Sequence, residues 1–122
     1  MAEAEATTTD LAPARARDLI GGGAQAVDVR NQYEHEAGHI AGDSNIPLAQ
    51  LDADIAGQLD RGKPVVLYCR SGQRSSMAAE ALRNSGWDAY HVEGGLLAWK
   101  DAGLPLEPEE GDVVERPNLP GA

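Results

Sequence analysis

The sequence predicts a single α/β domain in which a central parallel β-sheet is flanked by helices on both faces. A chain of 122 residues is suited to one compact domain rather than two. Short apolar segments typical of strands alternate with segments whose apolar residues recur every three or four positions, as in helices. The segment Val65–Tyr68 is apolar throughout, which is typical of a strand buried on both faces of a parallel sheet.

The first half of the chain is expected to form a helix, a strand and a second helix. Pro13 suits the first turn of a helix, and the glycines at positions 21–23 end it without the spacing of a phosphate-binding loop. Residues 24–30 (AQAVDVR) predict a short strand. The second helix, which ends before Gly62, is indicated by Leu48, Leu51, Ile55 and Leu59.

The second half of the chain is expected to add a helix, one more strand and a last helix, in that order. The helix after Val65–Tyr68 ends near Gly86, and its apolar face is formed by Met77, Ala78, Ala81 and Leu82. Residues 89–92 form the next strand. A last helix contains Leu96, Leu97 and Trp99 and ends at Gly103.

Both ends of the chain are predicted to be disordered tails around a working domain of residues 10–106. Residues 1–9 are small, polar and acidic, and residues 107–122 combine three prolines with five acidic residues. We interpret the acidic C-terminal segment as a solvated tail rather than a docking site for a partner.

The charge and cysteine content exclude several functions. A net charge of −10 with only two lysines argues against binding to nucleic acids or anionic membranes. No segment approaches the roughly 18 to 20 apolar residues that span a bilayer, and residues 1–10 lack the features of a secretory signal. We therefore expect a cytoplasmic protein, and we expect a monomer. Its one cysteine, Cys69, cannot form an intramolecular disulfide or a CxxC motif.

The segment YCRSGQRS at positions 68–75 lies between the most apolar strand and an amphipathic helix, where open α/β sheets bind their ligands. Backbone N–H groups and the helix N-terminus favour an anion in such a loop, and Gly72 permits a tight turn. With Arg70 and Arg74 close by, we expect Cys69 to be a nucleophilic thiolate at neutral pH without a histidine base. The alternative is a buried cysteine that acts as a small hydrophobic residue.

The chain resembles a single-domain rhodanese over roughly residues 10–105. The resemblance rests on CRSGQRS at 69–75, DVR at 28–30, Glu34, GHIAGDSNIPL at 38–48 and EGGLLAW at 93–99. It implies a rhodanese-like fold and a sulfurtransferase that needs no cofactor and carries a persulfide on its catalytic cysteine. Cys69 matches that cysteine. The residues that match the family's anion-binding loop are Arg70, Ser71, Gly72, Gln73 and Arg74.

Loop length separates this chemistry from that of related phosphatases. Cys69 and Arg74 form a C-x4-R pattern, whereas the phosphatases and arsenate reductases resemble C-x5-R with a larger loop. We therefore predict sulfur transfer from a thiosulfate-type donor to cyanide or a thiol, with a sulfur-relay protein as a further partner. The alternatives are a persulfide carrier fed by a partner protein and a catalytically silent domain, which the cysteine disfavours.

The other polar residues are expected to have structural roles. Asp28, Arg30 and Glu34 are expected to support the loop through an ion-pair network, with Arg30 paired to Glu34 near the surface. No metal site is expected, because no cysteine or carboxylate falls at ligand spacing with His35, His39 or His91. Met77 is expected in the core.

Overall fold

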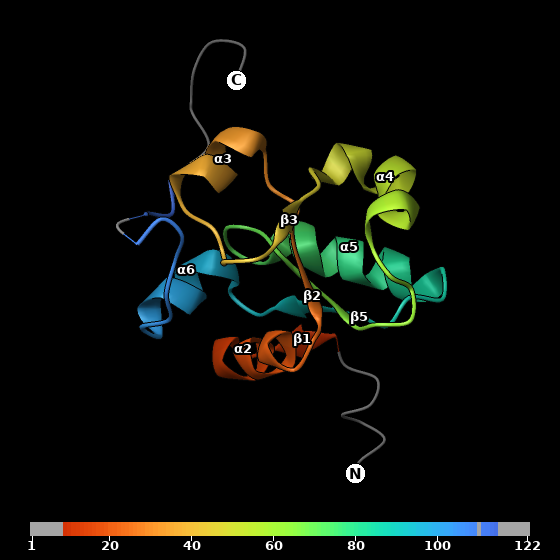
Figure 1. Cartoon of the computed structure of the whole chain (residues 1–122), viewed down its shortest axis with the longest axis horizontal. Helices are drawn as coiled ribbons and strands as arrows, with labels where there is room; N and C mark the ends of the chain where they lie inside the picture. The colour runs from red at the N-terminus through yellow and green to blue at the C-terminus, as the bar shows by residue number, and fades with distance from the viewer. Residues whose placement is uncertain (1–8, 110, 115–122) are drawn as a thin grey trace.

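The computed structural model describes residues 9–109 and 111–114, and its centre is a five-stranded parallel sheet (Figure 1). The strand order is β1-β5-β4-β2-β3, and every pairing is parallel. The strands are β1 (Asp10–Leu11), β2 (Gln25–Asp28), β3 (Ser44–Asn45), β4 (Val65–Tyr68) and β5 (Ala89–Val92). β4 lies in the middle of the sheet and is buried along its whole length, as its apolar sequence predicts.

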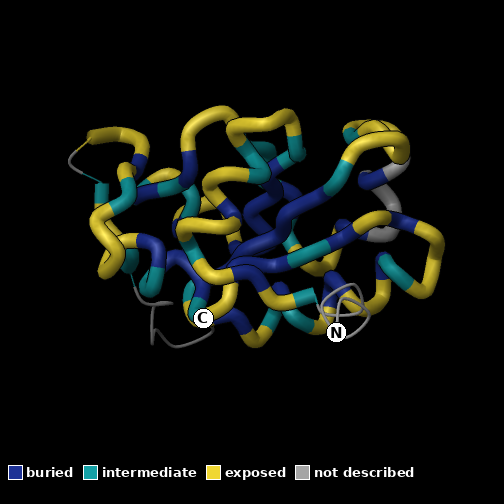
Figure 2. Tube along the Cα trace, turned by 90° about the horizontal axis from the view of Figure 1, so that it is seen from below, coloured by how far each residue is buried: buried dark blue, intermediate teal, exposed yellow. Residues whose placement is uncertain are grey.

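Helices cover both faces of this sheet, which confirms the predicted fold class. They are α2 (Pro13–Gly21), α3 (Gln32–Ala37), α4 (Leu51–Gln58), α5 (Gln73–Asn84) and α6 (Gly95–Asp101). A short 3₁₀ helix, Leu48–Gln50, leads into α4. In Figure 2 the buried segments run through the middle of the molecule, and exposed segments surround them.

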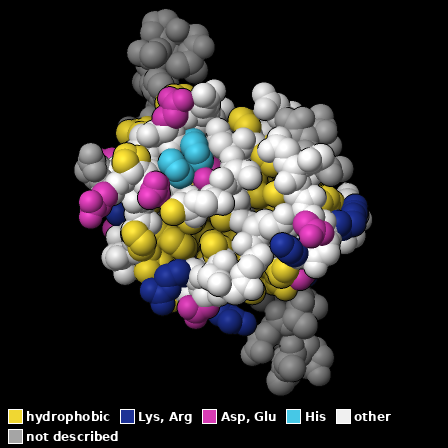
Figure 3. Space-filling view, in the orientation of Figure 1, with side chains coloured by type: hydrophobic (Ala, Val, Ile, Leu, Met, Phe, Trp, Pro, Cys, Tyr) yellow, Lys and Arg dark blue, Asp and Glu magenta, His cyan; other side chains and the backbone are white. Residues whose placement is uncertain are grey.

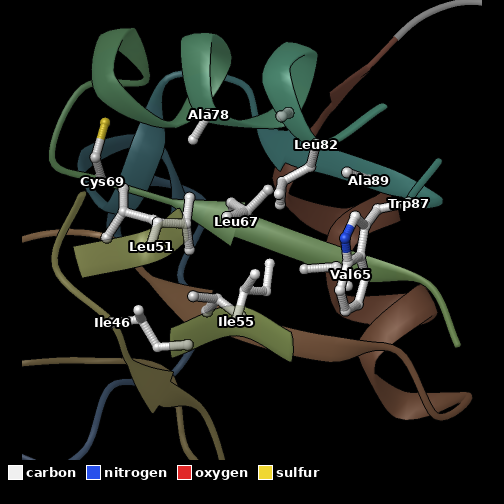
Figure 4. Close-up of a cluster of buried hydrophobic side chains, with 13 residues drawn as sticks. Ile46, Leu51, Ile55, Val65, Leu67, Cys69, Ala78, Leu82, Trp87 and Ala89 are labelled. Carbon is white, nitrogen blue, oxygen red and sulfur yellow. The ribbon is translucent and has the colours of Figure 1, made fainter. Parts of the chain in front are cut away.

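Two buried clusters lie on opposite faces of the sheet because successive side chains of a strand point to opposite sides. In β4, Val65 and Leu67 enter one cluster with residues of α4 and α5, as Figure 4 shows. Val66 and Tyr68 enter the other cluster, with residues of α2 and α6. Cys69 continues the alternation and belongs to the first cluster.

Three elements were not predicted from the sequence. β1 and β3 have two residues each, which is too short for a periodic pattern. α3 has no apolar stripe, and its one buried residue is Glu34. The Glu34 carboxylate accepts the backbone N–H of Asn31 at 3.2 Å, which stabilises the start of this helix.

The C-terminal segment begins with residues that pack against the domain, beyond the expected boundary at residue 106. Glu107 and His39 exchange two backbone hydrogen bonds of 2.7 and 3.0 Å. The N–H of Asp112 donates to the carbonyl of Ala37 at 2.8 Å, and Asp112 forms an ion pair with Lys100. Residues 1–8, 110 and 115–122 lie outside the described part of the chain, so the prediction of disordered tails stays a prediction there.

The buried face of α5 differs from the predicted one. Its buried residues are Ser75, Ala78, Ala79 and Leu82, whereas Met77 is 68% exposed. The prediction that Met77 lies in the core was wrong, because the buried face is shifted towards Ser75 at the start of the helix. Within the described residues, no helix combines the length and apolar character needed to cross a bilayer.

Candidate active site

Cys69 follows β4 directly and lies at the carboxyl end of the sheet, at the start of the loop that leads into α5. Its Sγ accepts hydrogen bonds from the backbone N–H groups of Gly72 at 3.0 Å and Ser75 at 3.4 Å. Figure 4 shows the sulfur pointing towards the first turn of α5. Gly72 adopts φ 103°, a conformation that favours glycine, and this bends the loop around the sulfur. Backbone dipoles therefore favour negative charge on Sγ.

The first turn of α6 holds this loop from the side. Leu96 N–H donates to the Cys69 carbonyl at 2.8 Å, and Leu97 N–H donates to the Arg70 carbonyl at 3.1 Å. Gly95 has φ +66°, and a Cβ atom placed there would lie 2.7 Å from the Cys69 carbonyl oxygen. Only glycine permits this close approach, so the loop backbone is held in place by α6.

Arg74, predicted to bind the anionic substrate, forms an ion pair with Glu34 on α3. Its two terminal nitrogens lie 3.2 and 3.1 Å from the Glu34 carboxylate oxygens. The Arg74 side chain is 24% exposed and that of Glu34 is fully buried. Burial lowers the pKa of Arg74, but the hydrogen bonds and charge of Glu34, with a contribution from Cys69, outweigh burial and raise it. Arg74 therefore keeps a fixed positive charge near the thiol.

The expected pairing of Arg30 with Glu34 was wrong, because Arg30 pairs with Asp28 instead. Nε and Nη2 of Arg30 donate to the two Asp28 carboxylate oxygens at 2.8 and 2.7 Å, and Nη2 also donates to the Gly38 carbonyl at 2.7 Å. Both side chains are fully buried, so this pair is not near the surface. Burial lowers the pKa of Arg30, but Asp28 outweighs it and the net pKa is raised. The pair fixes the chain between β2 and α3.

An open pocket of about 540 Å³ lies beside the loop. Ser71 and Gln73 are exposed and line it, together with Gly72. Arg70 is half-buried. The pocket also includes Met77, Glu93 and Gly94 on its walls. This space lies next to the loop that encloses Cys69, and it is large enough for a small anion.

A hydrogen-bonded chain that sequence reasoning missed runs from Cys69 to Asp10. Ser75 Oγ lies 3.5 Å from Cys69 Sγ and 3.1 Å from Nδ1 of His91. Nε2 of His91 lies 2.7 Å from the Asp10 carboxylate. The one signal in the sequence was a histidine within the strand AYHV, where the flanking residues are apolar or aromatic.

A second group of polar residues gathers beside β2. His35 and His39 stack with ring centroids 3.9 Å apart, and their ligand atoms lie within 4.8 Å of each other and of Asp43. The expectation that no carboxylate accompanies these histidines was therefore wrong, since the loop after His39 brings Asp43 back to them. Figure 3 shows histidine side chains together on one surface beside acidic ones.

Hydrogen bonds within the protein already engage this group. His35 Nδ1 contacts Asp28 at 3.0 Å, and His39 Nδ1 donates to the His35 carbonyl at 2.8 Å. The Tyr68 hydroxyl donates to Asp43 at 2.6 Å. Burial raises the pKa of Asp43 despite that hydrogen bond, and burial with the charges of Asp28 and Asp43 raises the pKa of Tyr68.

Comparison with known proteins agrees with this fold. Residues 12–102 match the family model of the rhodanese-like domain. An uncharacterized Synechocystis protein is 41% identical over 86% of this chain and 59% of its own length. The thiosulfate sulfurtransferase GlpE of Pseudomonas aeruginosa is 33% identical over 84% of this chain and 93% of its own. The crystal structure of a rhodanese-related protein from Thermoplasma volcanium is similar with a TM-score of 0.74 and 32% identity, over 80% of this chain and 95% of that one.

The chain belongs to the rhodanese-like domain family, and its relatives include sulfurtransferases. It spans about three-fifths of the length of the Synechocystis protein, which therefore has sequence beyond the shared domain.

Proposed function

We propose that the protein is a sulfurtransferase that moves sulfane sulfur from a thiosulfate-type donor to a nucleophilic acceptor through a persulfide on Cys69. The observation that carries this proposal is the position of Sγ, which accepts two backbone N–H groups at the N-terminus of α5. Such donors stabilise a thiolate and the charge that develops on a sulfur bound to it.

The first half-reaction is a displacement at the outer sulfur of the donor. The Cys69 thiolate attacks this sulfur of thiosulfate, and a new S–S bond forms with Sγ. The bond between the two thiosulfate sulfurs breaks, and sulfite leaves with its electron pair. The fixed charge of Arg74 and the α5 N-terminus favour the anionic donor at the loop.

The second half-reaction returns the enzyme to its starting state. Cyanide or a thiolate attacks the terminal sulfur of the persulfide, and the S–S bond breaks with its electron pair going to Sγ. In this proposal Arg70, Ser71, Gly72, Gln73 and Arg74 bind the donor. Asp28, Arg30 and Glu34 hold the loop by anchoring α3 and Arg74.

A persulfide carrier is the second candidate function. The Synechocystis relative is longer than this chain, which is compatible with a domain that passes sulfur within a larger assembly. The hydrogen bonds to Sγ support this role equally well, because a carrier needs the same stabilised persulfide. Turnover distinguishes the two, since a carrier loads once with sulfur and then stops without its partner.

The test is the intact mass of the protein under non-reducing conditions after thiosulfate treatment, with sulfite release followed in parallel. We expect the wild type to gain one sulfur atom and to release an equal amount of sulfite, while Cys69→Ser gains none. Because Cys69 is the one cysteine, any adduct reports on that residue. No mass gain in a protein whose thiol still reacts with an alkylating agent would contradict thiosulfate as the donor.

A further inference from the structure

We propose that Ser75, His91 and Asp10 form a proton relay that converts the Cys69 thiol into the thiolate used for sulfur transfer, which replaces the expectation of a thiolate formed without a histidine base. This inference rests on the function proposed above. It assigns a role in the reaction to three residues on three different elements: α5, β5 and β1.

The hydrogen bonds define which atoms donate in the resting state. The Asp10 carboxylate can only accept, so Nε2 of His91 donates in the 2.7 Å contact. In a neutral imidazole Nδ1 is then an acceptor, and the Ser75 hydroxyl donates to it across 3.1 Å. While that proton is on the way to Nδ1, the Ser75 oxygen can accept the proton of a Cys69 thiol. Once the sulfur is a thiolate, the hydroxyl donates to Sγ across 3.5 Å, which is the direction of this contact in the structure. The Gly72 carbonyl, 3.4 Å from Ser75 Oγ, is a further acceptor for the same hydroxyl.

Two protons then move, each along one of these contacts. The S–H bond of Cys69 breaks as its proton passes to Ser75 Oγ, and the original Ser75 proton passes to Nδ1 of His91. The products are a thiolate, stabilised by the N–H groups of Gly72 and Ser75, and an imidazolium, stabilised by the Asp10 carboxylate. Neither electrons nor heavy atoms are exchanged.

The sheet holds the relay in position. Asp10 and His91 are directly paired in the register of β1 and β5. On the other side of β5, the register partner of His91 is Leu67, which is apolar. His91 is 4% exposed, so its imidazole is shielded from water at the end that faces Ser75.

The outer end of the relay is open to water. The Asp10 side chain is 52% exposed, and it lines the 540 Å³ pocket together with His91. A proton on the imidazole can therefore exchange with solvent through this pocket. Among the described residues, the titratable groups near His91 are Asp10, Glu93, which lines the same pocket, and Cys69, which His91 reaches through Ser75.

The test measures the thiolate directly by its ultraviolet absorbance as a function of pH, with Cys69→Ser subtracted as the baseline. We expect the thiolate population of His91→Gln at pH 6.5 to be about tenfold lower than that of the wild type, because the group that takes up the thiol proton is gone. Above about pH 9.5 the thiolate should be restored, because free thiols ionise there unaided. Asp10→Asn should show an intermediate loss. His39→Gln, which removes a histidine outside the relay, should match the wild type.

Sulfur loading by thiosulfate is measured on the same variants. Loading of His91→Gln should be slow at pH 6.5 and approach the wild-type rate at high pH. A loss of thiolate in His91→Gln without loading of any variant, wild type included, would support the relay but overturn thiosulfate as donor. Wild-type thiolate and loading in folded His91→Gln at every pH would overturn the relay and leave the proposed function standing.

His91 is buried, so near-ultraviolet circular dichroism of the two tryptophans checks the fold of each variant. If His91→Gln does not fold, Asp10→Asn decides the matter, since Asp10 is half-exposed and its amide keeps the shape of the side chain. Wild-type thiolate titration in Asp10→Asn would then contradict the relay, and a reduced thiolate population at pH 6.5 would support it.

Discussion

Two polar networks meet at the Cys69 loop, one on the β2 side of β4 and one on the β5 side, and they use charge differently. On the β2 side, Arg30 pairs with Asp28 and Arg74 pairs with Glu34, so each carboxylate is buried against a guanidinium that stays charged. We call these four residues the β2-side network. On the β5 side, the chain of Ser75, His91 and Asp10 contains an imidazole and ends in a half-exposed carboxylate.

The difference suggests a division of labour around one sulfur atom. Guanidinium groups do not release protons at physiological pH, so the β2-side network can supply fixed charge and rigidity but no proton transfer. A neutral imidazole has one ring nitrogen that can take up a proton, so the β5 side can accept a proton.

Replacing Arg30 should cause the largest loss of stability. Arg30→Met leaves the buried Asp28 carboxylate without its main partner, and breaking a buried ion pair typically costs about 3 to 5 kcal/mol. Urea unfolding measures this loss. The double variant Asp28→Asn with Arg30→Met should recover part of it, because no unpaired buried charge remains. Folded Arg30→Met should still form the persulfide, and complete loss of sulfur loading in folded protein would give Arg30 a direct role.

The segment after Leu106 should stabilise the end of α3 and the residues that follow it, because its backbone hydrogen bonds go to Ala37 and His39. A chain that ends at Leu106 loses the two Glu107–His39 hydrogen bonds and the one from Asp112 to Ala37, at about 0.5 to 1.5 kcal/mol each. A chain that ends at Val114 keeps them and serves as the matched control. Thermal unfolding should separate the two chains by several degrees, whereas both should transfer sulfur. Equal stability would show that these contacts contribute nothing.

Releasing Arg74 from Glu34 should change binding of the donor more than stability. In Glu34→Gln the Arg74 charge is no longer neutralised, so KM for thiosulfate should fall about three- to tenfold, the effect of about 1 kcal/mol. Arg74→Met should raise KM instead. Steady-state kinetics with cyanide as acceptor measures both. A higher KM in Glu34→Gln would mean that Arg74 binds the donor only when Glu34 holds it in place.

The smallest effect is expected at Asp43, whose pKa is raised by burial above its ordinary value near 3.8. The native state therefore binds the Asp43 proton more tightly than the unfolded state does. The stability that this proton contributes is present below the unfolded pKa and is lost as pH rises through the native pKa.

Asp43→Asn has no such ionisation, and its amide oxygen can still accept the Tyr68 hydroxyl. Relative to wild type, the variant should gain stability from pH 3.5 to pH 7, by less than about 1 kcal/mol. Urea unfolding at several pH values measures the difference. A relative loss of stability with rising pH would show that the charge of Asp43 is favourable in the folded state.

Much of the fold was predictable from local patterns, whereas the polar contacts depend on tertiary structure. The apolar run of β4 and the glycines after α2 identify buried and terminating positions without knowledge of the fold. Arg30 and Glu34 are four residues apart, which suggested a local pair. In the structure each of the two pairs with a different residue, and the partner of Glu34, Arg74, is 40 positions away in the sequence.

In the candidate site, too, the local features were predictable and the tertiary contacts were not. The sequence CRSGQRS predicts a turn that encloses a sulfur, because its glycine and its place between strand and helix are local features. The contact between His91 and Asp10 joins residues 81 positions apart and exists because β1 pairs with β5. A two-residue strand carries no periodic signal, so no pattern could place Asp10 at this site.

The most direct test of the central claim is a single round of sulfur transfer. The protein first takes up sulfur from thiosulfate and is then separated from the remaining donor. Cyanide is added to this loaded protein, and the thiocyanate formed and the intact mass of the protein are measured together. We predict one thiocyanate for each loaded chain, return of the mass to that of the free thiol, and no product from Cys69→Ser. Loaded protein that keeps its extra sulfur in the presence of cyanide would contradict transfer to small nucleophiles.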